Sequence, residues 1–534
     1  MIRSLAFLIL AALFPLTLQA AEPFSLEEMT IPQFQVKMES GELTSEQIIR
    51  RYLDRIAGID GPGNPTVAEA AKLDGIHLNS IIEINPDALA IARERDEERK
   101  RGRVRGPLHG IPIVIKDNID TADAMMTTAG SLALAGNRAK QDAFIVGKLR
   151  EAGAVILAKT NLSEWANFRS TRSSSGWSGR GGQTRNPYVL SRNPCGSSAG
   201  TGAAVAANLA AAGIGTETDG SIVCPSNANG LVGFKPTLGL WSRSGIIPIA
   251  HSQDTAGPMT RTVTDAAILL GALAGPDPRD PETAKNADHR KTDYTPFLDP
   301  GALKGKRIGV ARKHFGFDPD VDALMEQAIE VIKGLGAEIV DPADIDTHGQ
   351  FRDSEYTVLL YEFKHGLERY LQAMPESVKV RTLADLIAWN EEHANEEMPY
   401  FGQEIFEQAQ AKGPLTDAAY LEALEKNHAL ARREGIDETL ATADLDALIA
   451  PTGSPAWPTD LVNDDHFIGG YSSPSAVAGY PHITVPLGFV HGLPVGISFF
   501  AGAWSEPELI GIAFAFEQAT RARRPPRFLE VPEL

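Results

Sequence analysis

With 534 residues, of which 43% are hydrophobic and 22% charged, the chain is long enough to bury a large core. Its formal net charge of −19 makes a surface that repels phosphate backbones, so nucleic acid is excluded as an expected partner. Two cysteines, Cys195 and Cys224, are too few for a disulfide-based scaffold. An exported protein could oxidise this pair, but the sequence does not determine whether they meet, and unpaired thiols are the favoured interpretation.

The N-terminus has the pattern of a secretory signal peptide. Arg3 precedes a short apolar run that contains Pro15, and the small residue Ala20 ends it before a polar stretch. The run is shorter than the roughly 20 residues that cross a bilayer, which argues against a stable membrane anchor. We therefore expect residues 1–20 to be removed and the mature chain, 21–534, to be exported to the periplasm or the medium.

Helix and strand patterns then alternate along the chain, which predicts the α/β class. A capping box at Thr44–Gln47 begins a helix. The β-branched run Ile111–Ile115 predicts a buried strand, and the alanine- and glycine-rich stretch 199–212 predicts a tightly packed helix. From about 346 to 444 the composition turns to Ala, Glu, Leu and Lys, which predicts a helical layer or insertion within one domain, before strand patterns return.

Ser198 is the centre of Gly-Ser-Ser-Ala-Gly, residues 196–200, which matches the G-x-S-x-G pattern of a serine esterase. That interpretation requires a strand before the serine and a histidine base. The approach instead carries prolines and is typical of a loop, and the sequence context of His109 and His251 fits ordinary loop residues. No H-x-x-x-H or C-x-x-C spacing and no complete glycine-rich nucleotide motif is present, so neither a metal nor a cofactor is expected.

A lysine can replace histidine as the base if it is neutral. Burial disfavours the ammonium form and can lower a lysine pKa from about 10.4 towards 7–8. Lys116 follows the strand Ile111–Ile115, where its side chain could point inward. The alternative is a lysine at a strand edge that pairs with Asp117 or another carboxylate, and this stretch alone favours the alternative.

A second candidate lies in the turn that follows a strand at residues 215–221. Gly220 permits a tight backbone path in which consecutive N–H groups converge on one oxygen, next to the hydroxyl of Ser221. Such a turn could supply a nucleophile and an oxyanion hole together. Taken alone, a Gly-Ser turn is usually no more than a turn.

Three segments, GIPIVIKDNID, the long block from NPCGSSAGTG through TETDGSIVCPS to DTAGPM, and GYPHITVPLGF, together resemble the amidase signature family. The resemblance covers nearly the whole mature chain and implies a large twisted mixed β-sheet covered by helices on both sides. It implies that Lys116 is the base, that Ser197, held by a cis peptide bond, relays protons, and that Ser221 is the nucleophile. The match of Ser198 to the esterase pattern is then a coincidence, and Ser198 is expected to cap the following helix.

The resemblance also assigns an oxyanion hole and a reaction. The hole consists of four backbone N–H groups, those of Thr218, Asp219, Gly220 and Ser221. The implied reaction is hydrolysis of a carboxylic amide through an acyl-enzyme, without metal or cofactor.

The expected substrate is inferred from positions at which this chain differs from most members of the family. Many family members carry arginine where this chain has Val223, so the cation expected for a substrate carboxylate is absent at that point. The variant most resembles the peptide amidase branch, which removes ammonia from C-terminally amidated peptides. Three alternatives remain: a broad amidase on aryl or aliphatic amides, a protein like the glutaminase subunit of the tRNA-dependent amidotransferase, and a non-catalytic exported binding protein. The signal peptide argues against the second.

Overall fold

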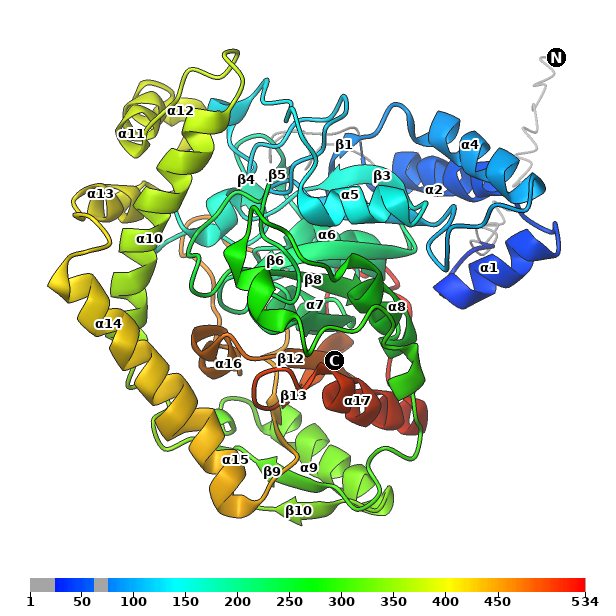
Figure 1. Ribbon diagram of the computed structural model, residues 1–534, viewed down its shortest axis with the longest axis vertical. Coiled ribbons are helices and arrows are strands. Elements are labelled where there is room, and N and C mark those ends of the chain that lie inside the picture. The colour runs from blue at the N-terminus through cyan, green and yellow to red at the C-terminus, as the bar shows by residue number, and fades with distance from the viewer. Residues whose placement is uncertain (1–24, 62–74, 534) are drawn as a thin grey trace, which may run out of the picture.

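The computed structural model describes residues 25–61 and 75–533, and a single wide β-sheet lies at its centre (Figure 1). Eleven strands pair in the order β1-β3-β2-β6-β8-β7-β12-β13-β11-β9-β10. Their bounds are β1 Ile81–Ile84, β2 Pro112–Lys116, β3 Val155–Thr160, β6 Ala212–Glu217, β7 Val232–Lys235, β8 Thr255–Thr260, β9 Arg307–Val310, β10 Glu338–Val340, β11 Ala447–Pro451, β12 His482–Val490 and β13 Leu493–Phe500. Strand β2 runs parallel to β3 and β6, whereas β12 is antiparallel to β7 and β13. The predicted mixed sheet is confirmed.

Helices cover both faces of this sheet, as predicted. On one face, α6 (Ala199–Ala206) and α7 (Val223–Ala228) pack against each other and against the central strands. On the other face, a continuous layer packs α5 on α8, α8 on α17 and α17 on α9. The bounds of that layer are α5 Phe144–Glu151, α8 Val263–Leu273, α9 Pro319–Gly334 and α17 Glu506–Thr520. The strands between the two layers are almost completely buried, which matches their continuous apolar sequences.

One of the N-terminal helices begins at the cap that the sequence predicts. Helix α2 (Ser45–Ile59) starts at Thr44, whose hydroxyl accepts from Gln47 N at 3.2 Å while Gln47 Oε1 accepts from Thr44 N at 3.0 Å. This reciprocal pair is the predicted capping box. The neighbouring helices are α1 Ile31–Glu39 and α4 Ala88–Lys100.

Helix α6 is shorter than the sequence predicts. The helix expected over 199–212 ends at Ala206, because Asn208 adopts a left-handed conformation with φ of 58°. Leu209 N then donates to Ala204 O and Asn208 N to Val205 O, the two hydrogen bonds of a Schellman motif. The chain turns there and enters β6 at Ala212, so the alanine-rich run is divided between a helix and a strand.

The segment 346–444 contains helices without a strand among the described residues, and they form the arm at the left of Figure 1. Their bounds are α10 Arg352–Ala373, α11 Leu383–Glu392, α12 Ala394–Glu397, α13 Glu404–Gln410, α14 Ala418–His428, the π-helix Ala429–Ile436 and α15 Asp437–Ala443. Helix α16, Ser473–Ala478, follows later and contacts α14.

The predicted signal peptide, 1–20, lies outside the described residues. Among the residues that are described, no helix combines the length and apolar character needed to cross a membrane.

Candidate active site

Lys116 and Ser197 are in direct contact inside the protein. Lys116 is the last residue of β2 and is fully buried, and its Nζ lies 2.7 Å from Ser197 Oγ. The same nitrogen lies 2.9 Å from Thr216 Oγ1 and 3.2 Å from Thr216 O, on the adjacent strand β6. The favoured alternative from the strand alone, an edge lysine paired with Asp117, is therefore wrong: Asp117 instead receives hydrogen bonds from Thr128 N and Gly130 N.

Burial sets the protonation of this lysine. Loss of hydration lowers the pKa of Lys116 from 10.5 to about 7, although the charges of Glu217 and Asp254 act in the opposite direction. A substantial fraction of the side chain is therefore a neutral amine near pH 7. A neutral amine can accept a proton from the hydroxyl that it touches.

Ser197 is held in a tightly packed bend that precedes α6. The peptide bond between Gly196 and Ser197 is cis, and Ser197 O accepts a hydrogen bond from Ser163 N at 3.0 Å. A Cβ placed on Gly196 would overlap Ser163 Oγ, so a larger residue would have to displace this hydroxyl, which accepts from Gly176 N at 2.8 Å. The bend directs the Ser197 hydroxyl at Lys116.

Ser198 does not have the surroundings of a nucleophile. It is fully buried, and its Oγ donates to Thr216 O at 3.1 Å and accepts from Thr216 N at 3.2 Å. It occupies the N-cap position of α6 without making a side-chain cap, so the expectation that Ser198 caps this helix is wrong. Its hydroxyl instead joins the start of α6 to strand β6.

The two histidines considered as alternative bases are engaged elsewhere. His109 Nε2 lies 2.9 Å from Arg95 O, and His251 Nδ1 lies 3.3 Å from a carboxylate oxygen of Glu362. Burial lowers the pKa of both imidazoles. His109 is a buried structural histidine, whereas His251 lies in the lining of the cavity described below; among the described residues, neither hydrogen-bonds to Ser198.

Ser221 lies in the turn that connects β6 to α7. Gly220 has a φ of 79°, a conformation in which a side chain is disfavoured, and Gly220 O accepts from Cys224 N at 2.8 Å. Ser221 is 8% exposed, whereas Lys116 and Ser197 are at 0%, so of the three side chains only Ser221 reaches an accessible surface. Among the described residues, no hydrogen bond joins the hydroxyls of Ser197 and Ser221; Ser221 is joined to this region by its carbonyl oxygen, which accepts from Ser198 N at 3.2 Å.

The backbone N–H groups of this turn are available to a ligand. Four backbone N–H groups are expected to form the oxyanion hole: those of Thr218, Asp219, Gly220 and Ser221. Within the described part of the chain, none of these four donates a hydrogen bond. The next two N–H groups, of Ile222 and Val223, are both accepted by Glu217 Oε2, at 2.8 and 3.1 Å. Glu217 therefore fixes the exit of the turn and leaves its first four donors unused.

Buried charges surround the turn, and the sequence reasoning missed their roles. Burial raises the pKa of Glu217, against the influence of Lys235, and burial lowers the pKa of Lys235 to about 8. The Asp219 side chain turns away towards Ser473, whose Oγ donates to it at 2.5 Å. Burial raises the pKa of Asp219 and raises that of its hydrogen-bonded neighbour Glu355 well above its ordinary value, so Glu355 carries the proton of this pair. Only Glu217 could have been found from its place in the TETDGSIVCPS motif.

A disulfide joins the two serine-bearing segments. Cys195, next to the cis bond, is bonded to Cys224 in α7, with their Cα atoms 5.9 Å apart. The favoured interpretation of unpaired thiols is therefore wrong, because the fold brings together two cysteines that are 29 residues apart in sequence. A second connection runs in parallel: Asn229 Nδ2 donates to Pro194 O at 2.9 Å.

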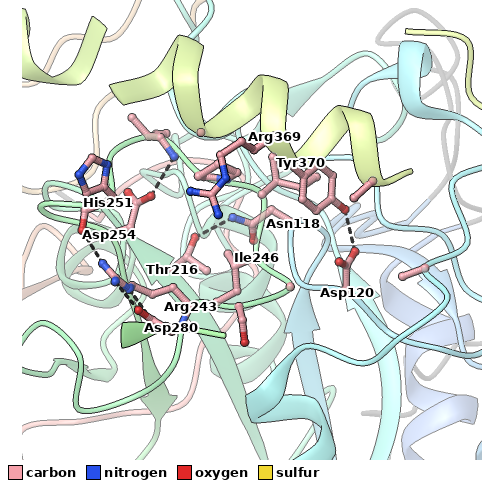
Figure 2. Close-up of a pocket in the computed structure, with 18 of the residues that line it drawn as sticks. Asn118, Asp120, Thr216, Arg243, Ile246, His251, Asp254, Asp280, Arg369 and Tyr370 are labelled. Carbon is pink, nitrogen blue, oxygen red and sulfur yellow. Dashed lines mark hydrogen bonds and ion pairs between the residues drawn. The ribbon is translucent and has the colours of Figure 1, made fainter. Parts of the chain in front are cut away.

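A cavity of about 580 Å³ opens beside this site (Figure 2). Thr216, Glu217 and Thr218 form one wall, and residues from α10 lie opposite. Asn118 Nδ2 donates to Thr216 Oγ1 at 3.0 Å, which links the cavity floor to the threonine that also holds Lys116. The volume suits a small molecule or a short peptide segment. In the described residues no cluster of three or more His, Cys, Asp or Glu side chains could hold a metal ion.

Comparison with known proteins shows that most of the chain is similar to amidases. A family model described as Amidase matches residues 67–510. The X-ray structure of the native peptide amidase from Stenotrophomonas maltophilia is 53% identical, covers 95% of this chain and 100% of its own, and superposes with a TM-score of 0.88. A probable amidase from Arabidopsis thaliana is 42% identical over 522 residues, 96% of this chain and 94% of the relative. A glutamyl-tRNA(Gln) amidotransferase subunit from Halorhodospira halophila is 33% identical over 505 residues, 93% of this chain and 98% of the relative.

Proposed function

Because the chain belongs to the amidase signature family and is an amide-cleaving hydrolase, we propose that it releases ammonia from C-terminally amidated peptides through an acyl-enzyme on Ser221. The observation that carries the mechanism is the 2.7 Å contact between Lys116 Nζ and Ser197 Oγ, inside a region that lowers the pKa of Lys116 to about 7. The 53% identity to a peptide amidase supports the choice of substrate.

Acylation begins with two proton transfers. Neutral Lys116 takes the proton of the Ser197 hydroxyl, and Ser197 takes the proton of Ser221 as the Ser221 oxygen attacks the amide carbonyl carbon. The carbonyl oxygen becomes an oxyanion, which the unused N–H groups of residues 218–221 stabilise. These donors are fixed before the substrate arrives, because Glu217 and the disulfide hold the turn on either side.

The tetrahedral intermediate then breaks its carbon–nitrogen bond. The Lys116 ammonium returns its proton through Ser197 to the leaving nitrogen, which departs as ammonia and leaves the acyl group esterified to Ser221. Water repeats the sequence as the nucleophile: it loses a proton through Ser197 to Lys116, attacks the ester, and restores the Ser221 hydroxyl as the carboxylic acid product forms.

Substitution of each side chain tests these roles. We expect Ser221→Ala and Lys116→Ala to lower kcat by at least about 10³-fold, since each removes a group on which the others depend. Ser197→Ala should also abolish turnover, whereas Ser198→Ala should keep measurable activity, because Ser198 only bonds the backbone of Thr216. Loss of activity in Ser198→Ala alone would favour the esterase interpretation. Failure of a fluorophosphonate probe to label Ser221 would favour a non-catalytic binding protein.

A panel of amides tests the substrate. Ammonia release should be fastest with blocked peptide amides, slower with free amino-acid amides and anilides, and negligible with free glutamine. The last expectation rests on Val223, which offers no cation to the glutamine α-carboxylate. Preference for anilides or aliphatic amides would favour a broad amidase, and glutamine hydrolysis would favour the function of the amidotransferase relative, which is 33% identical.

We also propose that the protein is exported after cleavage near Ala20. The basic, apolar and small-residue pattern of residues 1–20 supports this, and so does the Cys195–Cys224 disulfide, since such bonds persist in oxidising compartments. Mass spectrometry of the protein from a periplasmic fraction should give an N-terminus close to Ala21. An intact N-terminus in the cytoplasm would contradict the proposal.

A further inference from the structure

The cavity reaches Thr218 at the start of the turn that carries Ser221, and we infer that it receives the acyl portion of the substrate. Thr218 contributes both a cavity wall and one of the proposed oxyanion donors, and Thr216 contacts the cavity and Lys116. A peptide amide with its carbonyl in the turn would therefore extend its chain into the cavity.

Each acidic side chain that lines the cavity already has partners. Asp254 accepts from Thr218 Oγ1 at 2.6 Å and from two backbone N–H groups, and Asp120 accepts from Tyr370 at 2.7 Å. Asp142 and Asp280 form ion pairs with arginines, and Glu217 accepts from two backbone N–H groups. Every carboxylate of the lining therefore has a hydrogen-bond or ion-pair partner within the protein.

The basic side chains of the lining are not balanced in the same way. Arg243 pairs with Asp280 at 2.6 Å, and Arg279 pairs with Asp277 at 3.2 Å. Arg369 and Lys140 also line the cavity, yet within residues 25–61 and 75–533 neither makes a side-chain hydrogen bond or an ion pair. Among the described residues, the lining thus holds two basic side chains without an ion-pair partner, in a protein whose net charge is −19.

Arg369 is the better placed of the two. It lies on α10, and Figure 2 shows its guanidinium pointing into the cavity towards Asn118. The next residue, Tyr370, donates its hydroxyl to Asp120 on the opposite wall, which anchors this part of α10 across the cavity. The guanidinium of an arginine offers a planar pair of donors that matches a carboxylate.

We propose that Arg369 makes this enzyme selective for peptide amides whose acyl portion carries a carboxylate, an aspartate or glutamate side chain near the amidated end. Lys140 adds to the positive potential at the same cavity. This inference rests on the proposed function. It explains why Val223 can replace the family's arginine: the cation that recognises the substrate is on α10 rather than beside the nucleophile.

The test compares acetylated tripeptide amides that carry Glu, the isosteric Gln, or Lys in turn at each position. For the wild type, kcat/KM should favour Glu over Gln at one position by about two- to fivefold, the range for a solvent-accessible ion pair. The preference should weaken as salt is raised. In Arg369→Gln the Glu:Gln ratio should fall to about one, and in Arg369→Glu the preference should change to Lys.

Arg103→Gln is the matched control, because Arg103 is an exposed arginine beyond the end of α4, outside the cavity. It should keep both the rate and the Glu:Gln ratio of the wild type. Equal or lower kcat/KM for Glu at every position, or a ratio that survives in Arg369→Gln, would overturn the inference. So would a ratio that is lost in Lys140→Gln but kept in Arg369→Gln. If no peptide amide releases ammonia at all, the proposed function fails instead.

Discussion

If Lys116 is the proposed base, the burial of its side chain sets how the rate of amide hydrolysis depends on pH. With its pKa lowered to about 7 by burial, the neutral fraction of the amine rises from about one in ten at pH 6 to about nine in ten at pH 8. We therefore expect kcat/KM for an uncharged peptide amide to rise about tenfold over this range and then to level off. The slope should correspond to the loss of one proton.

The position of this transition can be moved by one charge. Glu217 is the largest of the charges that favour the ammonium form, and Glu217→Gln keeps an acceptor for the Ile222 and Val223 N–H groups while removing the charge. Without that charge the ammonium is less stable, so the midpoint should shift to lower pH. The assay is ammonia release in buffers of constant ionic strength from pH 5 to 10. A flat wild-type profile, or a midpoint that moves upwards in Glu217→Gln, would refute the assignment of the base.

Three further predictions concern the same region. Lys116 has a pKa of about 7 in the folded protein and 10.5 in the unfolded chain, so unfolding takes up a proton between these values and the free energy of unfolding should rise with pH there. Between pH 7 and 9 the free energy of unfolding of the wild type, measured in urea, should rise by about 2 kcal/mol more than that of Lys116→Met. An equal pH dependence of the two proteins would count against a buried neutral amine. The double variant Cys195→Ser/Cys224→Ser should have a free energy of unfolding about 3–4 kcal/mol lower than the wild type, the value for a loop closed across 29 residues. A denaturation midpoint equal to that of the oxidised wild type would contradict this. Gly196→Ala should lower kcat while circular dichroism shows a folded protein, since the added methyl overlaps Ser163 Oγ beside the Ser197 bend. Near-normal kcat would show that the Ser163 hydroxyl moves and the bend does not.

Local sequence patterns predicted much of the fold because they act over a few residues. The capping box at Thr44 marked the start of α2, and the apolar run before Lys116 marked β2, since hydrogen bonding at a helix end and burial of a strand are decided by neighbouring side chains. The end of α6 was misjudged for a related reason. Asn208 carried the signal for a left-handed cap, but the alanines around it favour a helix equally on both sides.

The sequence by itself determined which side chains are available for chemistry: a lysine at the end of an apolar strand, two serines before a helix, and a serine after a glycine in a turn. Only the tertiary structure decided which of them meet. Lys116 and Ser197 are 81 positions apart, and they meet because the bend before α6 packs against the end of β2. Burial there removes the water that would keep the amine charged. The cavity depends on the fold even more, because Tyr370 and Asp120, which close it, are 250 positions apart. Contacts over such separations arise from the packing of whole elements, so no local pattern encodes them.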